Sequence, residues 1–373
     1  SYLPIPSHVG EMKTKPTQMA VRSLNSTGLQ PDFILCRSEK PIDDKRREKL
    51  AIFCNIKPQN AVSAPDTKSI YDIPLNFEKE DFGNKILRQF SMKSRPSDLS
   101  SWQKLADKAT SLKNHVVKIG IVGKYFATGD YVLADSYISI IEAVKHAAWT
   151  QNHTPQIEWL SSDDYESDPK KLKELSQYDG IIVPGGFGSR GVEGKIMTAG
   201  YCREHKIPYL GLCYGMQIAT IDFARNIAGL KKANTTEIDP KTPHPVIHLM
   251  QEQEKKMADK DYGGSMRLGG YECKLIKGTK AYDAYKKYQK DGLKNETIIE
   301  RHRHRFEFNN GYRQQLEKLG LVIAGVNPKQ NLVEIIELKD HPYFVGSQFH
   351  PELQSKPLTP HPLFMGLINA SKK

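Results

Sequence analysis

The sequence lacks the cysteine pairs on which a disulfide framework or a cysteine-ligated zinc site depends. Its 373 residues contain five cysteines, an odd number without a Cys-x-x-Cys spacing. They are widely scattered, at Cys36, Cys54, Cys202, Cys213 and Cys273. This usage is typical of a reducing compartment, so we expect a cytoplasmic protein and no metal site built on cysteine.

Long apolar runs, a secretion signal, internal repeats and low-complexity tracts are also missing from the sequence. We therefore expect no membrane partner. The formal net charge of +11 permits a nucleic-acid partner, but the basic residues are dispersed, without a long basic block. Phosphate-bearing small molecules and a solvated surface explain the charge equally well, so we expect no nucleic-acid partner.

The length favours two domains, and a content of 38% hydrophobic and 26% charged residues is that of an ordinary globular protein. Short apolar strands alternate with helical spacing, which predicts α/β architecture. The expected parts are a first domain at 1–90, a serine-containing linker with a connecting helix at 91–114, and a second domain at 115–373. The first domain has too few strands to close a core, so it is expected to be part of a doubly wound sheet.

The expected elements follow from apolar periodicity and from proline, glycine and capping residues. We expect helices at 17–24, 43–53, 102–112, 135–149 and 216–225, and a surface helix without an assigned role within the Lys- and Tyr-rich stretch 274–295. We expect strands at 33–36, 61–62, 116–122, 180–183, 207–210, 333–337 and 343–349.

One stretch, Gly211-Leu212-Cys213-Tyr214-Gly215, has the pattern of a nucleophile elbow between an apolar strand and a helix. Its glycines permit the tight turn that lifts the central side chain clear of the sheet. The dipole and the free N–H groups at the helix N-terminus stabilise a thiolate at Cys213. A free cysteine is also commonly just a small buried apolar residue, and the elbow alone leaves both interpretations open.

Two further motifs suggest that the elbow is catalytic. Pro184-Gly185-Gly186-Phe187-Gly188 follows a strand and can turn N–H groups toward one point, so it is a candidate oxyanion hole together with the N–H of Tyr214. A plain tight turn is the alternative. His350-Pro351-Glu352 ends another strand, where a histidine can be the base and the acid can hold its tautomer. The predicted triad is Cys213, His350 and Glu352.

Two basic motifs leave their alternatives open. Gly10–Gln18 places two lysines and two threonines near a helix N-terminus, which suits a phosphate, although a solvated polar loop is the more frequent explanation. In Arg301–Arg305 a strand would place His302 and His304 on one face; a metal site is disfavoured there, and an arginine that clamps a carboxylate or a solvated strand is preferred. Lys124 follows Val-Gly, but the P-loop spacing is absent.

These residues together resemble a known family. The second domain resembles a class I glutamine amidotransferase domain through Pro-Gly-Gly-Phe-Gly, Gly-Leu-Cys-Tyr-Gly-Met-Gln and Phe-His-Pro-Glu. The chain from Tyr2 to about Ala370 resembles the CTP synthase family through Gly-Glu-Met-Lys-Thr-Lys-Pro-Thr-Gln, Cys-Arg-Ser, Gly-Gly-Ser-Met-Arg-Leu-Gly and Glu-Arg-His-Arg-His-Arg-Phe-Glu. The resemblance implies a partial doubly wound, P-loop-like amidoligase segment followed by a complete class I glutamine amidotransferase α/β domain.

The resemblance also implies a reaction and its residues. ATP would phosphorylate UTP at O4, and ammonia from glutamine hydrolysis at the triad would displace that phosphate to give CTP. Glutamine would be held by Gly186, Tyr214, Gly215, Met216, Gln217, Glu237 and Arg305, with Arg305 on its carboxylate and Glu237 toward its α-amino group. UTP or the inhibitor CTP would contact Lys13, Thr14, Lys15, Pro16, Thr17, Gln18 and Lys49, and ATP would contact Arg37 and Asp66. Mg²⁺ with ATP, GTP as activator and a homotetramer are further implications.

Two departures from the family pattern matter. Tyr214 stands where the family usually has Leu, and we expect no more than an altered pocket wall. The family's phosphate loop and magnesium-binding acids would precede Ser1, so we expect this stretch to hydrolyse glutamine without making CTP by itself. Two alternatives are a stand-alone γ-glutamyl cysteine hydrolase, which the segment 10–18 disfavours, and a non-catalytic nucleotide-binding or assembly fragment, which the intact triad disfavours.

Overall fold

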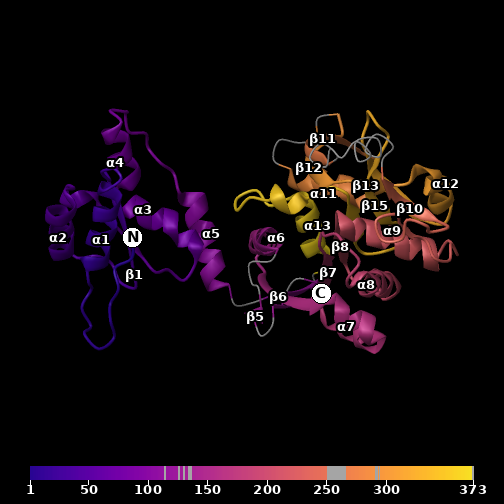
Figure 1. Ribbon diagram of the computed structural model, residues 1–373. Coiled ribbons are helices and arrows are strands. Elements are labelled where there is room, and N and C mark those ends of the chain that lie inside the picture. The colour runs from indigo at the N-terminus through magenta and orange to yellow at the C-terminus, as the bar shows by residue number, and fades with distance from the viewer. Residues whose placement is uncertain are drawn as a thin grey trace. The chain divides into compact units, whose positions relative to one another are not determined.

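The computed structural model describes residues 1–112, 115–124, 127–128, 131–132, 137–249, 266–289, 293 and 295–371. The chain divides into two compact units, residues 1–112 and residues 113–373, and each is described by itself (Figure 1). Some expected features lie outside the described residues: 263–265 of the Gly-Gly-Ser-Met-Arg-Leu-Gly motif, 113–114 of the linker, 135–136 of an expected helix, and 290–292 and 294 of the Lys- and Tyr-rich stretch.

The first unit is an α/β layer built on two parallel strands, in which Ile34 lies opposite Ala61. Its core is a small cluster of buried side chains that includes Leu3, Val21 and Leu50. Short 3-10 turns lie at Pro58–Asn60 and Ile70–Asp72. The helices and strands are α1 (Lys15–Asn25), β1 (Ile34–Ser38), α2 (Asp44–Cys54), β2 (Ala61–Pro65), α3 (Ile73–Lys79), α4 (Phe82–Gln89) and α5 (Ser100–Ser111).

Local sequence signals explain where the first two helices begin and end. Pro16 lies in the first turn of α1, where its missing N–H costs no hydrogen bond. Asp43 caps α2 by accepting a hydrogen bond from the Arg46 N–H at 2.8 Å. Asn55 ends α2 in the left-handed conformation, with φ of 53°. The two predicted helices are confirmed, whereas α3 and α4 lie in a region for which no helix was predicted.

A nine-stranded mixed sheet forms the centre of the second unit, in the order β12-β11-β14-β15-β16-β8-β7-β3-β6 among the described residues. The strands β6, β3, β7, β8 and β16 are parallel, and the remaining four pair antiparallel. The nine strands are β3 (Val116–Gly123), β6 (Thr154–Ser161), β7 (Gly180–Val183), β8 (Tyr209–Leu212), β11 (Arg267–Leu275), β12 (Thr297–His304), β14 (Leu321–Val326), β15 (Val333–Leu338) and β16 (Phe344–Ser347).

Helices cover both faces of this sheet, as Figure 1 shows for α8 and α9 on one side and for α6 and α13 on the other. Neighbouring residues of a strand point to opposite faces, so Ile181 packs on the first side and Ile182 on the second. The helices are α6 (Ile138–Thr150), α7 (Ser162–Ser167), α8 (Val192–Glu204), α9 (Tyr214–Asn226), α11 (Lys280–Tyr288), α12 (Asn310–Lys318) and α13 (Pro362–Ala370).

The remaining elements are short. A three-stranded sheet joins β13, β10 and β9, and a two-stranded one joins β4 and β5. These strands are β4 (Ala127–Thr128), β5 (Tyr131–Val132), β9 (Asn234–Thr235), β10 (Pro245–Leu249) and β13 (Phe306–Phe308), and 3-10 turns lie at Pro169–Gln177 and Pro351–Leu353.

The helix in the Lys- and Tyr-rich stretch, α11, is amphipathic: Lys286 and Lys287 are exposed, as expected of a surface helix. One of its faces is buried through Ala281, Ala284 and Tyr285. The Tyr285 hydroxyl donates to Oε1 of Glu300 at 2.7 Å. This face of the helix packs into the core beside α13, because its alanines permit a close approach between the two helices. The many lysines and tyrosines of the stretch give no indication of this packing.

Candidate active site

The three predicted motifs meet because they follow three adjacent parallel strands. In the sheet, β7 pairs with β8 and β8 pairs with β16. The glycine bend follows β7, Cys213 follows β8 and His350 follows β16. The carboxyl ends of parallel strands share one edge of the sheet, and ligands bind at this edge in α/β proteins. Strand order thus brings together residues that lie far apart in the sequence.

Cys213 has the strained backbone of a nucleophile elbow, with φ of 49° and ψ of −98°. Two close approaches require the glycines around it. A Cβ on Gly211 would lie 2.6 Å from the carbonyl carbon of Gly215, and a Cβ on Gly215 would lie 2.2 Å from the carbonyl oxygen of Val183. The Cys213 N–H donates to the carbonyl of Ser347 on β16 at 2.6 Å, which fixes the turn against the neighbouring strand.

His350 and Glu352 form the expected pair. Nδ1 of His350 lies 2.7 Å from Oε1 of Glu352, so the carboxylate fixes Nδ1 as the protonated nitrogen in the neutral ring. Burial alone would lower the pKa of His350, but the Cys213 thiolate and the Glu352 carboxylate outweigh burial and raise the pKa to about 11. The imidazole of His350 therefore favours its protonated form at neutral pH.

The glycine bend packs directly against this pair. A Cβ on Gly185 would lie 3.0 Å from Cε1 of His350 and 3.6 Å from Cβ of Cys213. Only a residue without a side chain leaves the imidazole its present position. The neighbouring Gly186 lines the cavity beside Cys213, as an oxyanion-hole donor must.

A cavity of about 430 Å³ opens over the nucleophile. The cavity is lined by five of the seven residues predicted to hold glutamine, together with Cys213 and His350. The other two, Gly215 and Met216, are buried in α9 and do not line it. The lining residues are Gly186, Phe187, Cys213, Tyr214, Gln217, Glu237, Met266, Arg303, His304, Arg305, Phe306 and His350.

Lys124 and Glu237 orient the glycine bend from two sides. The Lys124 ammonium donates to the carbonyls of Phe187 and Gly188. The Gly188 N–H donates to Oε1 of Glu237 at 3.0 Å. Lys124, rejected as a P-loop lysine, therefore lies at the end of β3 beneath the predicted oxyanion loop. The loop is thus tied to an acid of the cavity.

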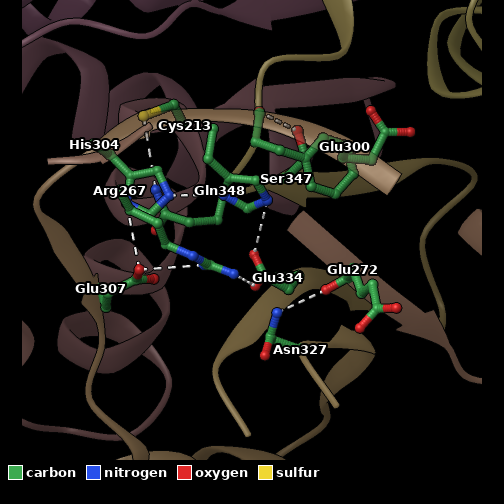
Figure 2. A network of polar contacts seen from close by, with 12 residues as sticks. Cys213, Arg267, Glu272, Glu300, His304, Glu307, Asn327, Glu334, Ser347 and Gln348 are labelled. Atoms are coloured by element: carbon green, nitrogen blue, oxygen red, sulfur yellow. Dashed lines mark hydrogen bonds and ion pairs between the residues drawn. The ribbon is translucent and has the colours of Figure 1, made fainter. Parts of the chain in front are cut away.

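A buried polar network lies next to the nucleophile (Figure 2). Nε2 of Gln348 lies 3.7 Å from Sγ of Cys213, and Nε2 of Gln217 lies 3.3 Å from Oε1 of Gln348. Arg267 donates to Glu334 at 2.7 Å and to Glu307 at 3.3 Å. Burial raises the pKa of both glutamates, and the arginine opposes that rise.

Strand β12 places the two histidines on one face, as predicted from the sequence: His302 and His304 are buried, whereas Arg301 and Arg303 are exposed. Nδ1 of His302 lies 2.9 Å from Nε2 of His304. Burial lowers the pKa of both histidines, so they remain neutral. Arg305, which follows the strand, reaches the cavity.

In the first unit, the residues predicted to bind ATP and those predicted to bind the pyrimidine nucleotide lie in different surroundings. Arg37 and Asp66 form a 2.8 Å ion pair and line a cavity of about 560 Å³ with apolar residues that include Ile70 and Phe77. Around the start of α1, Thr14, Thr17 and Gln18 are buried while Lys15, Pro16 and Lys49 are exposed, and Lys13 pairs with Glu11 at 2.6 Å.

Two buried charged residues near the site, Arg267 and Lys195, were not predicted from the sequence. Arg267 belongs to a quoted motif, but nothing in its spacing indicates two buried glutamates as partners. Lys195 is fully buried beneath the glycine bend, in a helix whose sequence looks like an ordinary mixed one. Both depend on contacts between distant segments, for which the sequence carries no local signal.

The chain matches known families in both units. Residues 132–370 match the family described as "Glutamine amidotransferase class-I", and residues 1–92 match that described as "CTP synthase N-terminus". The chain is 50% identical to the CTP synthase of Caldanaerobacter subterraneus over 97% of its own length, and 45% identical to that of Bacillus subtilis over 97%. It covers 64% of the length of each of these relatives.

A solved structure agrees with the second unit. It is the glutaminase domain of Trypanosoma brucei CTPS with bound acivicin, which is 33% identical to this chain. The match has a TM-score of 0.62 and covers 69% of this chain and 94% of that one.

Proposed function

Because the chain belongs to the class I glutamine amidotransferase family and, within it, to the CTP synthases, we propose that its second unit hydrolyses glutamine at Cys213. The observation that carries the proposal is one cavity that joins the strained cysteine, the histidine–glutamate pair and the glycine bend. This set supplies a nucleophile, a proton carrier and an oxyanion hole, which acyl transfer requires.

The proposed reaction begins from the thiolate–imidazolium pair. Sγ of Cys213 attacks the side-chain amide carbon of glutamine, and the N–H groups of Gly186 and Tyr214 bind the oxygen that becomes negative. His350 gives its Nε2 proton to the nitrogen as the carbon–nitrogen bond breaks, so ammonia leaves and a thioester remains. Water then attacks the thioester while His350 takes its proton, and glutamate is released.

Charges at the cavity wall suit the α-carbon end of glutamine. The Arg305 guanidinium would hold the α-carboxylate in its fork, and Glu237 would accept hydrogen bonds from the α-ammonium. The Glu237 carboxylate already accepts the Gly188 N–H. Substrate recognition and the oxyanion loop therefore share one acid.

We propose that the ammonia aminates UTP to CTP, with ATP as the phosphoryl donor. The region around Lys13–Gln18 and Lys49 would hold the pyrimidine nucleotide, and the Arg37–Asp66 cavity would hold part of ATP. CTP inhibition, GTP activation, a homotetramer and a cytoplasmic location belong to this proposal. Among the described residues no group of three or more His, Cys, Asp or Glu side chains is placed to hold a metal.

No helix within the described part of the chain is long and apolar enough to cross a membrane. All five cysteines are free and buried.

The test is release of ammonia from glutamine by the purified chain and by Cys213→Ala. We expect steady release by the parent chain, and a loss of at least about a thousandfold in the variant, because no other group can form the thioester. The melting temperature should stay unchanged, since the substitution removes one sulfur atom next to an existing cavity. Residual hydrolysis near the parent rate would refute the mechanism, and a folded but inactive parent chain would favour a non-catalytic role.

A further inference from the structure

Lys195 is a buried amine for which the proposed mechanism has no role. It lies on α8, is 0% exposed, and its Nζ has no hydrogen-bond partner within the described part of the chain. An unpaired buried ammonium costs considerable free energy, so a lysine in this position calls for a compensating contribution. The question is which group this amine faces.

The amine lies behind the predicted oxyanion hole. Its Nζ is 3.9 Å from the position that a Cβ on Gly186 would take, and 5.6 Å from the ring centroid of Tyr214. Gly186 and Tyr214 are the two residues whose N–H groups are proposed to bind the substrate oxygen. The face of an aromatic ring attracts a cation at this distance, so Tyr214 favours the charged form.

Few charged groups surround the amine. Burial and, to a smaller extent, the positive charge of Lys124 at the end of β3 lower the pKa of Lys195 to about 7, while Asp163 on α7 opposes this lowering. Asp163 is itself paired with Arg190 at 2.6 Å. From α9 the group that faces the amine is the Tyr214 ring, which carries no charge. The amine thus gains or loses its proton near neutral pH.

We propose that Lys195 is a positioning residue for the oxyanion hole: its protonated amine stabilises the negative oxygen bound at Gly186 and Tyr214. The inference rests on the proposed function, because it requires acyl transfer at Cys213. The amine touches neither the substrate nor the nucleophile. It acts through the two residues in front of it, and only while it carries a proton.

The charge of Lys195 sets the direction in which the hydrolysis rate should change with pH. The charge is present below about pH 7 and is lost as the pH rises through that value. His350 keeps its proton over this range, since its pKa is raised to about 11. We therefore expect the rate to fall as the pH rises through neutrality, because Lys195 loses its charge there. KM should change little, because the amide oxygen of bound glutamine is still neutral.

The experiment compares kcat profiles for glutamine hydrolysis from about pH 6 to about pH 9, since an amine of pKa 7 passes from mostly charged to mostly neutral in that range. Lys195→Met removes the charge and keeps the length; Lys195→Arg keeps the charge throughout. Lys118→Met is the matched control, because Lys118 lies on β3 in an ion pair with Glu158 at 3.2 Å.

We expect the parent kcat to fall on the order of tenfold across this range, less than the loss from deleting an oxyanion donor. Lys195→Met should be about tenfold slower at the acidic end and equal to the parent at the alkaline end. Lys195→Arg should lose the alkaline fall, and Lys118→Met should keep the parent profile. A Lys195→Met profile of parental shape, or one lowered equally at every pH, overturns the proposal.

Two reagents separate this inference from the glutaminase function. p-Nitrophenyl acetate acylates a reactive cysteine through a negative oxygen without using the glutamine-binding residues, so its pH profile must show the same dependence on Lys195. Iodoacetamide alkylates the thiolate without forming an oxyanion, so its profile must not. A parent chain that reacts with the ester but not with glutamine refutes the glutaminase proposal, and the ester profiles then decide the role of Lys195.

Discussion

The most direct test of the site's geometry is the substitution Gly185→Ala. A Cβ at this position would lie 3.0 Å from Cε1 of His350, about half an ångström closer than an ordinary carbon–carbon contact. The imidazole must then retreat by several tenths of an ångström. Because Cε1 joins the two ring nitrogens, that shift moves Nε2 away from Cys213 and also strains the 2.7 Å contact of Nδ1 with Glu352.

We expect kcat for ammonia release to fall on the order of tenfold, because a misplacement of about 1 Å can cost a hundredfold and this one is smaller. The melting temperature should remain within about 2 °C of the parent value, since the bend lies at a cavity. The assay couples released ammonia to glutamate dehydrogenase and also records KM, which should change little.

Gly120→Ala provides the matched control for this prediction. Its Cβ would lie 2.7 Å from Cδ1 of Leu160 and 2.8 Å from Cδ1 of Ile181, in the core and away from the triad. It should cost about 1–3 kcal/mol of stability through overpacking and leave kcat unchanged. A Gly185→Ala enzyme with parental kcat, or one that loses only stability, would refute the assigned packing of the bend against His350.

Two other predictions concern the charges around the cavity. Arg267→Met should lower the free energy of unfolding by about 3–5 kcal/mol at pH 8, because it leaves Glu307 and Glu334 buried without their cation. Urea denaturation measures this loss, which should shrink at acidic pH, where both carboxyls bind protons. An equal loss at both pH values would contradict the network. Glu237→Gln should raise KM for glutamine about tenfold, the effect of one charge-assisted hydrogen bond, as steady-state kinetics would show; an unchanged KM would remove Glu237 from the substrate site.

The sequence predicted the parts of the site that local chemistry controls. Glycines around Cys213, a proline in the first turn of α1 and the alternation of β12 each act within a few residues, so the elbow, the helix start and the placement of both histidines on one face could be predicted. Strand order could not be derived in this way. The position of β16 beside β8 depends on pairing between segments over a hundred residues apart in the chain.

The residues that escaped prediction share one physical property, which is burial of a charge. Arg267 and Glu334 lie in interior strands of the nine-stranded sheet, β11 and β15, and Lys195 lies in the helix α8. Local sequence cannot indicate that such a side chain points inward, because the compensating partner comes from another element. Tyr285 on α11 illustrates the same limit, since its partner Glu300 belongs to β12.

The reacting atoms of the site and the charges proposed to hold glutamine come from different structural elements. The nucleophile and the base follow parallel strands, β8 and β16, whose register is fixed by four paired residues and by the hydrogen bond from Cys213 to Ser347. The charges proposed to hold glutamine follow other elements: Arg305 joins β12 to β13, and Glu237 follows β9. Rigid strands therefore hold the reacting atoms, while connecting segments hold the substrate's ends.

Lys124 links the two groups of residues. Its ammonium binds the carbonyls of Phe187 and Gly188 in the glycine bend, and the N–H of Gly188 binds Glu237. Loss of glutamine's α-amino contact should consequently loosen the oxyanion loop as well, so a substrate analogue without that amino group should lose kcat in addition to affinity.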